Sequence, residues 1–133
     1  MLGEAVSLDS SAVISVVRQE QDHEYVIEAL EGASRIGIGA PTLTESSIVL
    51  VGRYGVAGRS ILSRFLEENR VVTIPFDDRH WAVAAEAFIR YGKGRHPAAL
   101  NYGDCMTYAT AQIAGVPLLY VGDDFAQTDI PSA

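Results

Sequence analysis

The chain has 133 residues, a length typical of a single domain. Its hydrophobic content of 48% excludes a disordered or low-complexity protein. The net charge of −7 argues against a protein that coats nucleic acid through a general basic charge. The single cysteine, Cys105, can form no internal disulfide and cannot hold zinc by itself, so we expect it to be a small buried side chain.

The sequence contains no segment typical of a membrane span or an export signal. The longest apolar stretch without charge, 113–122, is too short to cross a bilayer and is interrupted by Gly115 and Pro117. Glu4 stands where a signal peptide would carry a positive charge. Because a lone cysteine also suits a reducing compartment, we expect a cytoplasmic protein that contacts no membrane.

Short apolar runs alternate along the chain with longer segments of helical periodicity. In chain order, we predict a strand over 5–8, helices over 11–18 and 24–30, a strand over 35–40, helices over 41–54 and 59–69, a strand over 71–75, helices over 78–91 and 102–114, and a strand over 118–121. The β-branched residues of 71–75 predict a buried strand, and the helical spacing within 78–91 places Trp81 in the core.

Strands that are each joined to the next by helices are typical of a parallel sheet with right-handed crossovers. The sequence therefore predicts an α/β fold that forms one domain over residues 1–133. Its centre would be a parallel sheet of four to five strands, and helices would flank both faces of that sheet.

Acidic residues follow the predicted strands or open the predicted helices. Asp9 ends the first strand, and Asp123 and Asp124 end the last one. Glu45 and Asp104 lie in the first turns of two predicted helices. Because helix N-termini gather at the carboxyl edge of a parallel sheet, we expect these acids to converge there.

Each acid also has a purely structural explanation. Thr42 with Glu45 and Asn101 with Asp104 fit capping boxes, and Asp9 could cap a helix. Several carboxylates close together repel, however, and helix dipoles offset only part of that repulsion. Such a set normally requires a divalent cation or shared protons, and oxygen ligands without His or Cys suit Mg²⁺ or Mn²⁺.

The residues around these acids resemble the four acidic motifs of PIN-domain ribonucleases. The matching segments are Leu8-Asp9-Ser10-Ser11-Ala12, Thr44-Glu45, Asn101-Tyr102-Gly103-Asp104-Cys105 and Gly122-Asp123-Asp124-Phe125. Segments 91–104 and 118–130 are similar to VapC-type toxins of bacterial VapBC toxin–antitoxin modules. The resemblance covers nearly the whole chain, and it implies a PIN domain.

The resemblance implies a metal-dependent endoribonuclease that hydrolyses RNA phosphodiester bonds with a metal-activated water. It implies four catalytic acids that hold Mg²⁺ or Mn²⁺, namely Asp9, Glu45, Asp104 and Asp124. Asp123 is the alternative for the fourth acid, although Asp124 fits the family pattern better because it directly precedes Phe125. Ser10 or Ser11 corresponds to a hydroxyl residue that helps to orient the first acid.

The resemblance also implies binding partners. A VapB-type antitoxin would inhibit the toxin, and the protein would meet DNA only indirectly, through that antitoxin. The excess of acids makes a basic antitoxin segment reasonable. A homodimer is usual in the family, and segments 48–51 and 61–66 are apolar enough for a shared surface, although core packing explains them equally well.

A cluster of positive side chains interrupts this acidic sequence. Arg90, Lys93, Arg95 and His96 lie close together, and no acid stands between Ile89 and Gly103. These residues could form a solvated helix end, or Lys93, Arg95 and His96 could hold RNA phosphates. The sequence leaves the two interpretations open.

Two other functional classes fit parts of the pattern. A phosphoacceptor domain of the receiver type also gathers acids at the edge of a parallel sheet. Such domains normally need a lysine at the end of a late strand, and the only lysine here, Lys93, lies in a predicted loop. The second alternative is a PIN-like binding module without catalytic activity.

Overall fold

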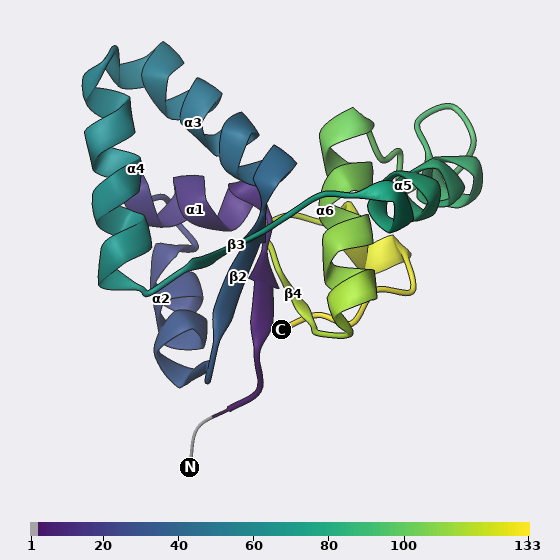
Figure 1. Ribbon diagram of the computed structural model, residues 1–133, viewed down its shortest axis with the longest axis horizontal. Coiled ribbons are helices and arrows are strands. Elements are labelled where there is room, and N and C mark those ends of the chain that lie inside the picture. The colour runs from purple at the N-terminus through teal and green to yellow at the C-terminus, as the bar shows by residue number, and fades with distance from the viewer. Residues whose placement is uncertain (1–2) are drawn as a thin grey trace.

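A four-stranded parallel sheet forms the centre of the computed structural model, which describes residues 3–133 (Figure 1). The strands are β1 (Val6–Leu8), β2 (Ile36–Gly39), β3 (Val72–Ile74) and β4 (Leu118–Leu119). They lie in the order β3-β2-β1-β4, and Ser7 of β1 pairs with Gly37 on one side and Leu118 on the other. The first and last strands of the chain therefore lie side by side, with β4 at one edge of the sheet.

Helices cover both faces of this sheet, as the sequence predicts. They are α1 (Ser10–Val17), α2 (His23–Gly32), α3 (Ala40–Tyr54), α4 (Ala57–Glu68), α5 (Asp78–Tyr91) and α6 (Tyr102–Ala114), followed by the short 3₁₀ helix η1 (Phe125–Gln127). Figure 1 shows α1 to α4 on one side of the strands and α5 and α6 on the other. None of the described helices is both long and apolar enough to span a lipid bilayer.

Each face of the sheet has its own hydrophobic core. Leu8, Ile38 and Leu119 pack with side chains of α1 to α4, whereas Leu118 packs with α5, α6 and the C-terminal tail. Leu118 and Leu119 point into different cores because successive side chains of a strand alternate between the two faces. The two cores hold β1 and β4 between them, and these two strands lead into the acidic residues.

Local capping signals set the ends of α5 and α6, which begin and end where the sequence predicts. Asp77 and His80 form a capping box that starts α5, and Asn101 and Asp104 form one that starts α6. Gly115 ends α6 with a φ of 69°, in the left-handed region that glycine adopts easily. His80 is thus a buried capping residue.

Two predictions about burial are wrong. Strand β3 lies at the edge of the sheet, so Val72 is 57% exposed rather than buried. Trp81 is 61% exposed at the rim of an apolar hollow between α5 and α6, because the buried stripe of α5 runs through His80, Ala84 and Ala87. Cys105 is buried as expected, and this burial raises the pKa of its thiol to about 11.

Candidate active site

The carboxyl ends of β1 and β4 face the starts of α1, α3 and α6, and these three helix starts group above the strands in Figure 1. A cavity of about 300 Å³ opens at this edge. Its lining residues are Asp9, Ser10, Ser11, Ile14, Glu20, Asp104, Val121, Asp124 and Phe125. Residues from the two ends of the chain therefore meet in one acidic cavity.

Asp9 follows β1 directly and is the N-cap of α1. Its Oδ2 accepts hydrogen bonds from the backbone N–H of Ser11 at 3.1 Å and from the Ser11 hydroxyl at 2.6 Å. The Ser11 hydroxyl in turn accepts a bond from the backbone N–H of Val121 at 3.0 Å. Both bonds to Asp9 end on Oδ2, so Oδ1 is left for another ligand. Ser11 thus orients Asp9 and links it to the segment that follows β4.

Asp104 lies in the first turn of α6, where it shares a capping box with Asn101. The Asn101 side-chain oxygen accepts a bond from the Asp104 N–H at 2.9 Å, and Asp104 Oδ2 accepts one from the Asn101 N–H at 3.1 Å. Burial raises the pKa of Asp104 to about 6, with further contributions from the charges of Asp9, Asp124 and Glu45, while the bond from Asn101 opposes the shift. Asp104 therefore caps a helix and also faces three like charges.

Glu45 lies in the second turn of α3, not in the first. The helix begins at Ala40 with Gly39 as its N-cap, one residue before the expected start at Pro41. The expected capping box between Thr42 and Glu45 is not formed, because Thr42 is buried and its hydroxyl pairs with the Thr107 hydroxyl at 2.8 Å. Glu45 is therefore not used to cap α3.

The Glu45 carboxylate lies against the start of α6 instead. A Cβ atom at Gly103 would stand 2.9 Å from Glu45 Oε2 and 3.0 Å from Oε1, so the carboxylate occupies space that only a glycine leaves open. Burial raises the pKa of Glu45, and the charge of Asp9 raises it further, whereas the Ser10 hydroxyl acts in the opposite direction. Glu45 thus approaches the other acids from a third helix.

Asp124 reaches this cavity and Asp123 does not. Asp124 belongs to the lining, and its charge contributes to the raised pKa of Asp104. Asp123 is exposed and lines no part of the cavity. Asp124 precedes η1, but its side chain forms no capping bond there. Its carboxylate is therefore left to face the other acids.

The donor set is made of carboxylate oxygens, the ligands that Mg²⁺ and Mn²⁺ prefer. Within residues 3–133, no three Asp, Glu, His or Cys side chains stand close enough to hold a metal ion in their present positions. Cation binding would require the acids to turn toward one another, and their mutual repulsion opposes this until a positive charge offsets it. Burial is the main cause of the raised pKa of Asp104, and the charges of Asp9, Asp124 and Glu45 add to it.

The positive residues of the 92–100 loop lie outside the acidic cavity. Arg95 donates a hydrogen bond to the carbonyl of Ile89 at 3.2 Å, and the His96 ring accepts one from a backbone N–H within the loop at 3.0 Å. Lys93 is exposed. Figure 1 shows this loop beyond α5, on the side away from the strands. RNA binding by Lys93, Arg95 and His96 stays a prediction.

Two features of the site were missed at the sequence level. Glu20 lines the cavity, where it also pairs with Arg18 at 3.4 Å. Gly103 makes room for the Glu45 carboxylate. A glycine in the first turn of a helix is a poor helix former, which was the available signal for a close approach at that position.

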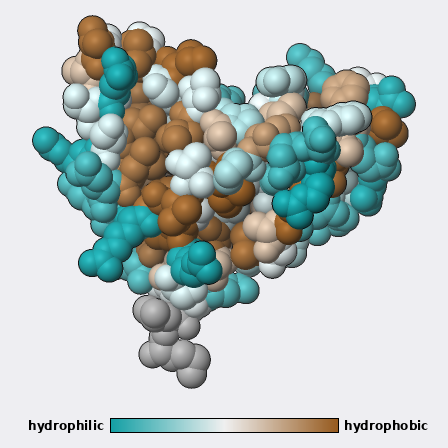
Figure 2. Space-filling view, in the orientation of Figure 1, coloured by the Kyte–Doolittle hydropathy of each residue, from teal (hydrophilic) through white to brown (hydrophobic). Residues whose placement is uncertain are grey.

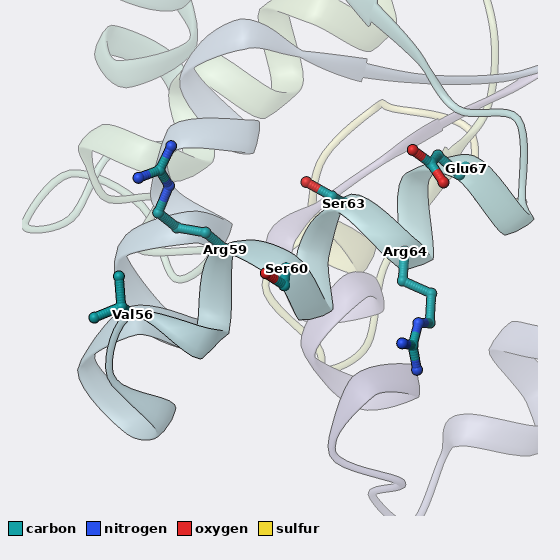
Figure 3. Close-up of a pocket in the computed structure, with 6 residues that line it drawn as sticks. All are labelled: Val56, Arg59, Ser60, Ser63, Arg64 and Glu67. Atoms are coloured by element: carbon teal, nitrogen blue, oxygen red, sulfur yellow. The ribbon is translucent and has the colours of Figure 1, made fainter.

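An apolar groove and a second, more polar hollow lie away from the acids. The groove runs between α3 and α4, where Leu43, Ile48, Leu62 and Leu66 line about 330 Å³, and Figure 2 shows apolar residues gathered on this part of the visible face. The hollow of about 470 Å³ lies along α4, and Figure 3 shows Arg59 and Arg64 pointing to different sides of it. The groove includes residues of the two segments, 48–51 and 61–66, that were considered for a dimer surface. The lining of the hollow includes only one acid, Glu67.

Comparison with known proteins agrees with the fold. The family described as PIN domain matches residues 6–131. Ribonuclease VapC36 of Mycobacterium tuberculosis is 48% identical to this chain over 124 residues, which make up 92% of this chain and 89% of that protein. The predicted α/β fold of the PIN type is thus confirmed.

Solved structures with the same fold include toxins and toxin–antitoxin complexes. VapC20 of Mycobacterium tuberculosis, a toxin that cleaves the sarcin–ricin loop, gives a TM-score of 0.78 at 14% identity and covers 96% of this chain and 98% of that one. VapBC2 of Rickettsia felis, bound to a fragment of promoter DNA, gives 0.76 at 14% identity with 97% of each chain covered. By its sequence likeness to VapC36 and its match to the PIN model, this chain belongs to the PIN-domain family and, within it, to the VapC ribonucleases.

Proposed function

We propose that this protein is an endoribonuclease, the toxin of a VapBC-type module, and that it hydrolyses RNA phosphodiester bonds with the help of Mg²⁺ or Mn²⁺. Membership of the VapC ribonucleases supports the reaction class. The observation that carries the metal dependence is that Asp9, Asp104 and Asp124 line one cavity, with the Glu45 carboxylate beside Gly103 at its edge. The charges of Asp9, Asp124 and Glu45 add to the burial that raises the pKa of Asp104 to about 6. A protein keeps such unfavourable charge where an external cation or substrate offsets it.

In this proposal Asp9, Glu45, Asp104 and Asp124 hold the cation. The cation would supply Lewis-acid activation of water and would offset the charge that develops on the phosphoryl oxygens. Both hydrogen bonds from Ser11 end on Oδ2 of Asp9, so Oδ1 stays available to the cation. Asp104 must lose its proton before it binds a cation, so binding weakens as the pH falls below about 6.

A VapB-type antitoxin is the proposed protein partner, as in the complex from Rickettsia felis. The net charge of −7 and the acidic cavity favour a basic segment of that partner. Contact with DNA would then pass through the antitoxin, and a homodimer remains part of the proposal.

The two alternatives are less favoured. A receiver domain requires a lysine beside its acids, and Lys93 lies in the 92–100 loop, outside the cavity lining. A PIN-like module without activity would bind a metal ion but would turn over no RNA. Measurement of Mn²⁺ binding together with RNA cleavage separates that module from a nuclease.

The test compares the purified protein with its Asp9→Asn variant on structured RNA, in Mn²⁺ and in EDTA. We expect cleavage in Mn²⁺ alone and a loss of about 100-fold or more in the variant, since one charged ligand would be gone. Asn keeps an oxygen that can accept the bonds from Ser11, so the fold should survive. Cleavage that persists in EDTA and in the variant would contradict the proposed mechanism.

A further inference from the structure

A cluster of side chains holds the tail that follows Asp124, and the proposed mechanism gives this cluster no role. The Tyr108 hydroxyl donates a hydrogen bond to Asp129 Oδ1 at 2.5 Å, and an Arg90 nitrogen lies 3.5 Å from Asp129 Oδ2. Arg90 also donates to the Tyr91 hydroxyl at 2.8 Å and lies 4.8 Å from the centre of that ring. Both oxygens of Asp129 thus have a partner on α5 or α6.

The charged groups of this cluster are compensated by partners within the protein. Burial raises the pKa of the Tyr108 phenol, and the bond to Asp129 raises it further. The same bond is the main cause that lowers the pKa of Asp129, to which Arg90 also contributes. The proton therefore stays on Tyr108 and the negative charge on Asp129.

Tyr108 lies one helical turn after Asp104, so the two side chains share a face of α6. Asp124 and Asp129 lie on either side of η1. The bond between Tyr108 and Asp129 therefore ties the segment that carries Asp124 to α6, the helix that carries Asp104. Figure 1 shows the tail beside α6.

The segment between Asp124 and Asp129 is short and internally bonded. Phe125 is buried and packs on Tyr120 with their ring centres 5.3 Å apart. The Thr128 hydroxyl donates to the carbonyl of Phe125 at 2.7 Å, and the Thr128 N–H donates to the same oxygen at 3.0 Å. A displacement of Asp129 should therefore also displace Asp124, because the segment between them is short and held by these contacts.

We propose that Tyr108 and Asp129 are positioning residues for Asp124: their hydrogen bond holds the segment that carries Asp124 against α6, the helix that carries Asp104. Ser11 performs the matching task at the other end of the segment, where its hydroxyl accepts the bond from Val121 N–H. The inference rests on the proposed function, because it assigns these residues to the assembly of the same metal site.

The test is the Tyr108→Phe variant, which removes one hydroxyl and keeps the ring. We expect Mn²⁺ affinity, measured by calorimetry, to fall about tenfold, as is usual when a group that orients a metal ligand is lost. In the metal-free protein, backbone amides of 122–128 should exchange their hydrogens faster. The same substitution in an Asp124→Asn background should weaken Mn²⁺ binding no further, because Tyr108 would act only through Asp124.

The matched control is Tyr25→Phe, since the Tyr25 hydroxyl also donates to the tail, at the carbonyl of Ala133 and 2.9 Å away, but far from Asp124 along the chain. It should leave Mn²⁺ binding and the exchange of 122–128 unchanged. Should Tyr108→Phe fail to fold, Asp129→Ala replaces it, because Asp129 is half exposed and Ala removes both the acceptor of the Tyr108 hydroxyl and the ion pair with Arg90.

Unchanged exchange of 122–128, or an equal loss of Mn²⁺ affinity with and without Asp124, overturns the inference. Absence of any Mn²⁺ binding by the unmodified protein counts against the proposed function instead. In that case the exchange measurement still decides whether Tyr108 holds the segment of Asp124.

Discussion

The acidic cavity and the Tyr108–Asp129 cluster lie at the two ends of one short segment, and they treat a carboxylate in opposite ways. In the cavity, burial and like charges raise the pKa of Asp104 to about 6. In the cluster, the bond from Tyr108 and the charge of Arg90 lower the pKa of Asp129. The protein thus offsets the negative charge of Asp129, which holds the tail, with Tyr108 and Arg90. It surrounds Asp104 with like charges instead, and a cation would offset them. Perturbed pKa values of carboxylates in a cleft are typical of functional sites.

The strongest way to break this contrast is to remove the charge of Asp104 with Asp104→Asn. Asn keeps an oxygen that can accept the bond from the Asn101 N–H. We expect Mn²⁺ binding to be lost and RNA cleavage to fall by about 100-fold or more, since a charged ligand is removed. Calorimetry and a cleavage assay measure the two effects, and Asp123→Asn is the control because Asp123 lies outside the cavity.

The same variant should be more stable than the unmodified protein when EDTA is present. Folding raises the pKa of Asp104 from 3.8 to about 6, so its contribution to stability is complete below pH 3.8 and is lost as the pH rises through 6. At pH 7.5 Asp104→Asn should therefore gain about 1–2 kcal/mol in the free energy of unfolding, after allowance for solvent screening. Urea titrations at pH 7.5 and 4 should show this gain shrinking at the lower pH. A loss of stability at pH 7.5 would mean that Asp104 is stabilised by its surroundings, as Asp129 is.

A second change sharpens the contrast without altering any charge. In Gly103→Ala the new Cβ would stand 2.9 Å from Glu45 Oε2 and displace that carboxylate. We expect Mn²⁺ affinity to fall about tenfold, which is the effect of disturbing the placement of a ligand. Gly52→Ala, in α3, is the control because nothing lies within 4 Å of its added Cβ. The control should keep its metal affinity and gain about 0.5–1 kcal/mol of stability through better helix propensity. Equal metal affinity in the two variants would show that Glu45 is not a metal ligand.

Features that depend on neighbouring residues could be predicted from the sequence. The ends of α5 and α6 follow from capping boxes at Asp77 and Asn101 and from Gly115, all of which act within a few residues. The placement of Asp9 and Asp104 at one edge follows from the parallel sheet alone. Local chemistry and the topology of the sheet were enough for these elements.

Features that depend on the order of the strands could not be predicted in this way. The β-branched residues of β3 suit a buried strand as well as an edge strand, and only the strand order places β3 at the edge. The sequence places Thr42 and Glu45 at the spacing of a capping box. Because α3 packs on α6, however, the Thr42 hydroxyl forms a hydrogen bond with the Thr107 hydroxyl instead. The Asp129 anchor was missed because Arg90 and Tyr108 come from two other helices.

The smallest expected effect concerns the 92–100 loop, where the contrast extends to positive charges. Arg90, just before this loop, forms an ion pair with Asp129, whereas Lys93 forms no ion pair within residues 3–133. If Lys93 contacts an RNA phosphate, Lys93→Ala should raise KM for RNA about threefold, leave kcat unchanged and reduce the salt dependence of binding by about one counterion. Arg64→Ala is matched to it, because Arg64 is an exposed cation on α4, on the other face of the sheet.

A general attraction of RNA to positive charge would weaken binding equally in the two variants, because each loses one exposed cation from a chain of net charge −7. A specific phosphate contact would appear in Lys93→Ala alone and would vanish at high salt, where counterions screen both proteins alike. If neither variant differs from the unmodified protein, the loop is a solvated helix end. RNA binding would then have to depend on the acidic cavity, where a cation rather than a side chain would supply the positive charge.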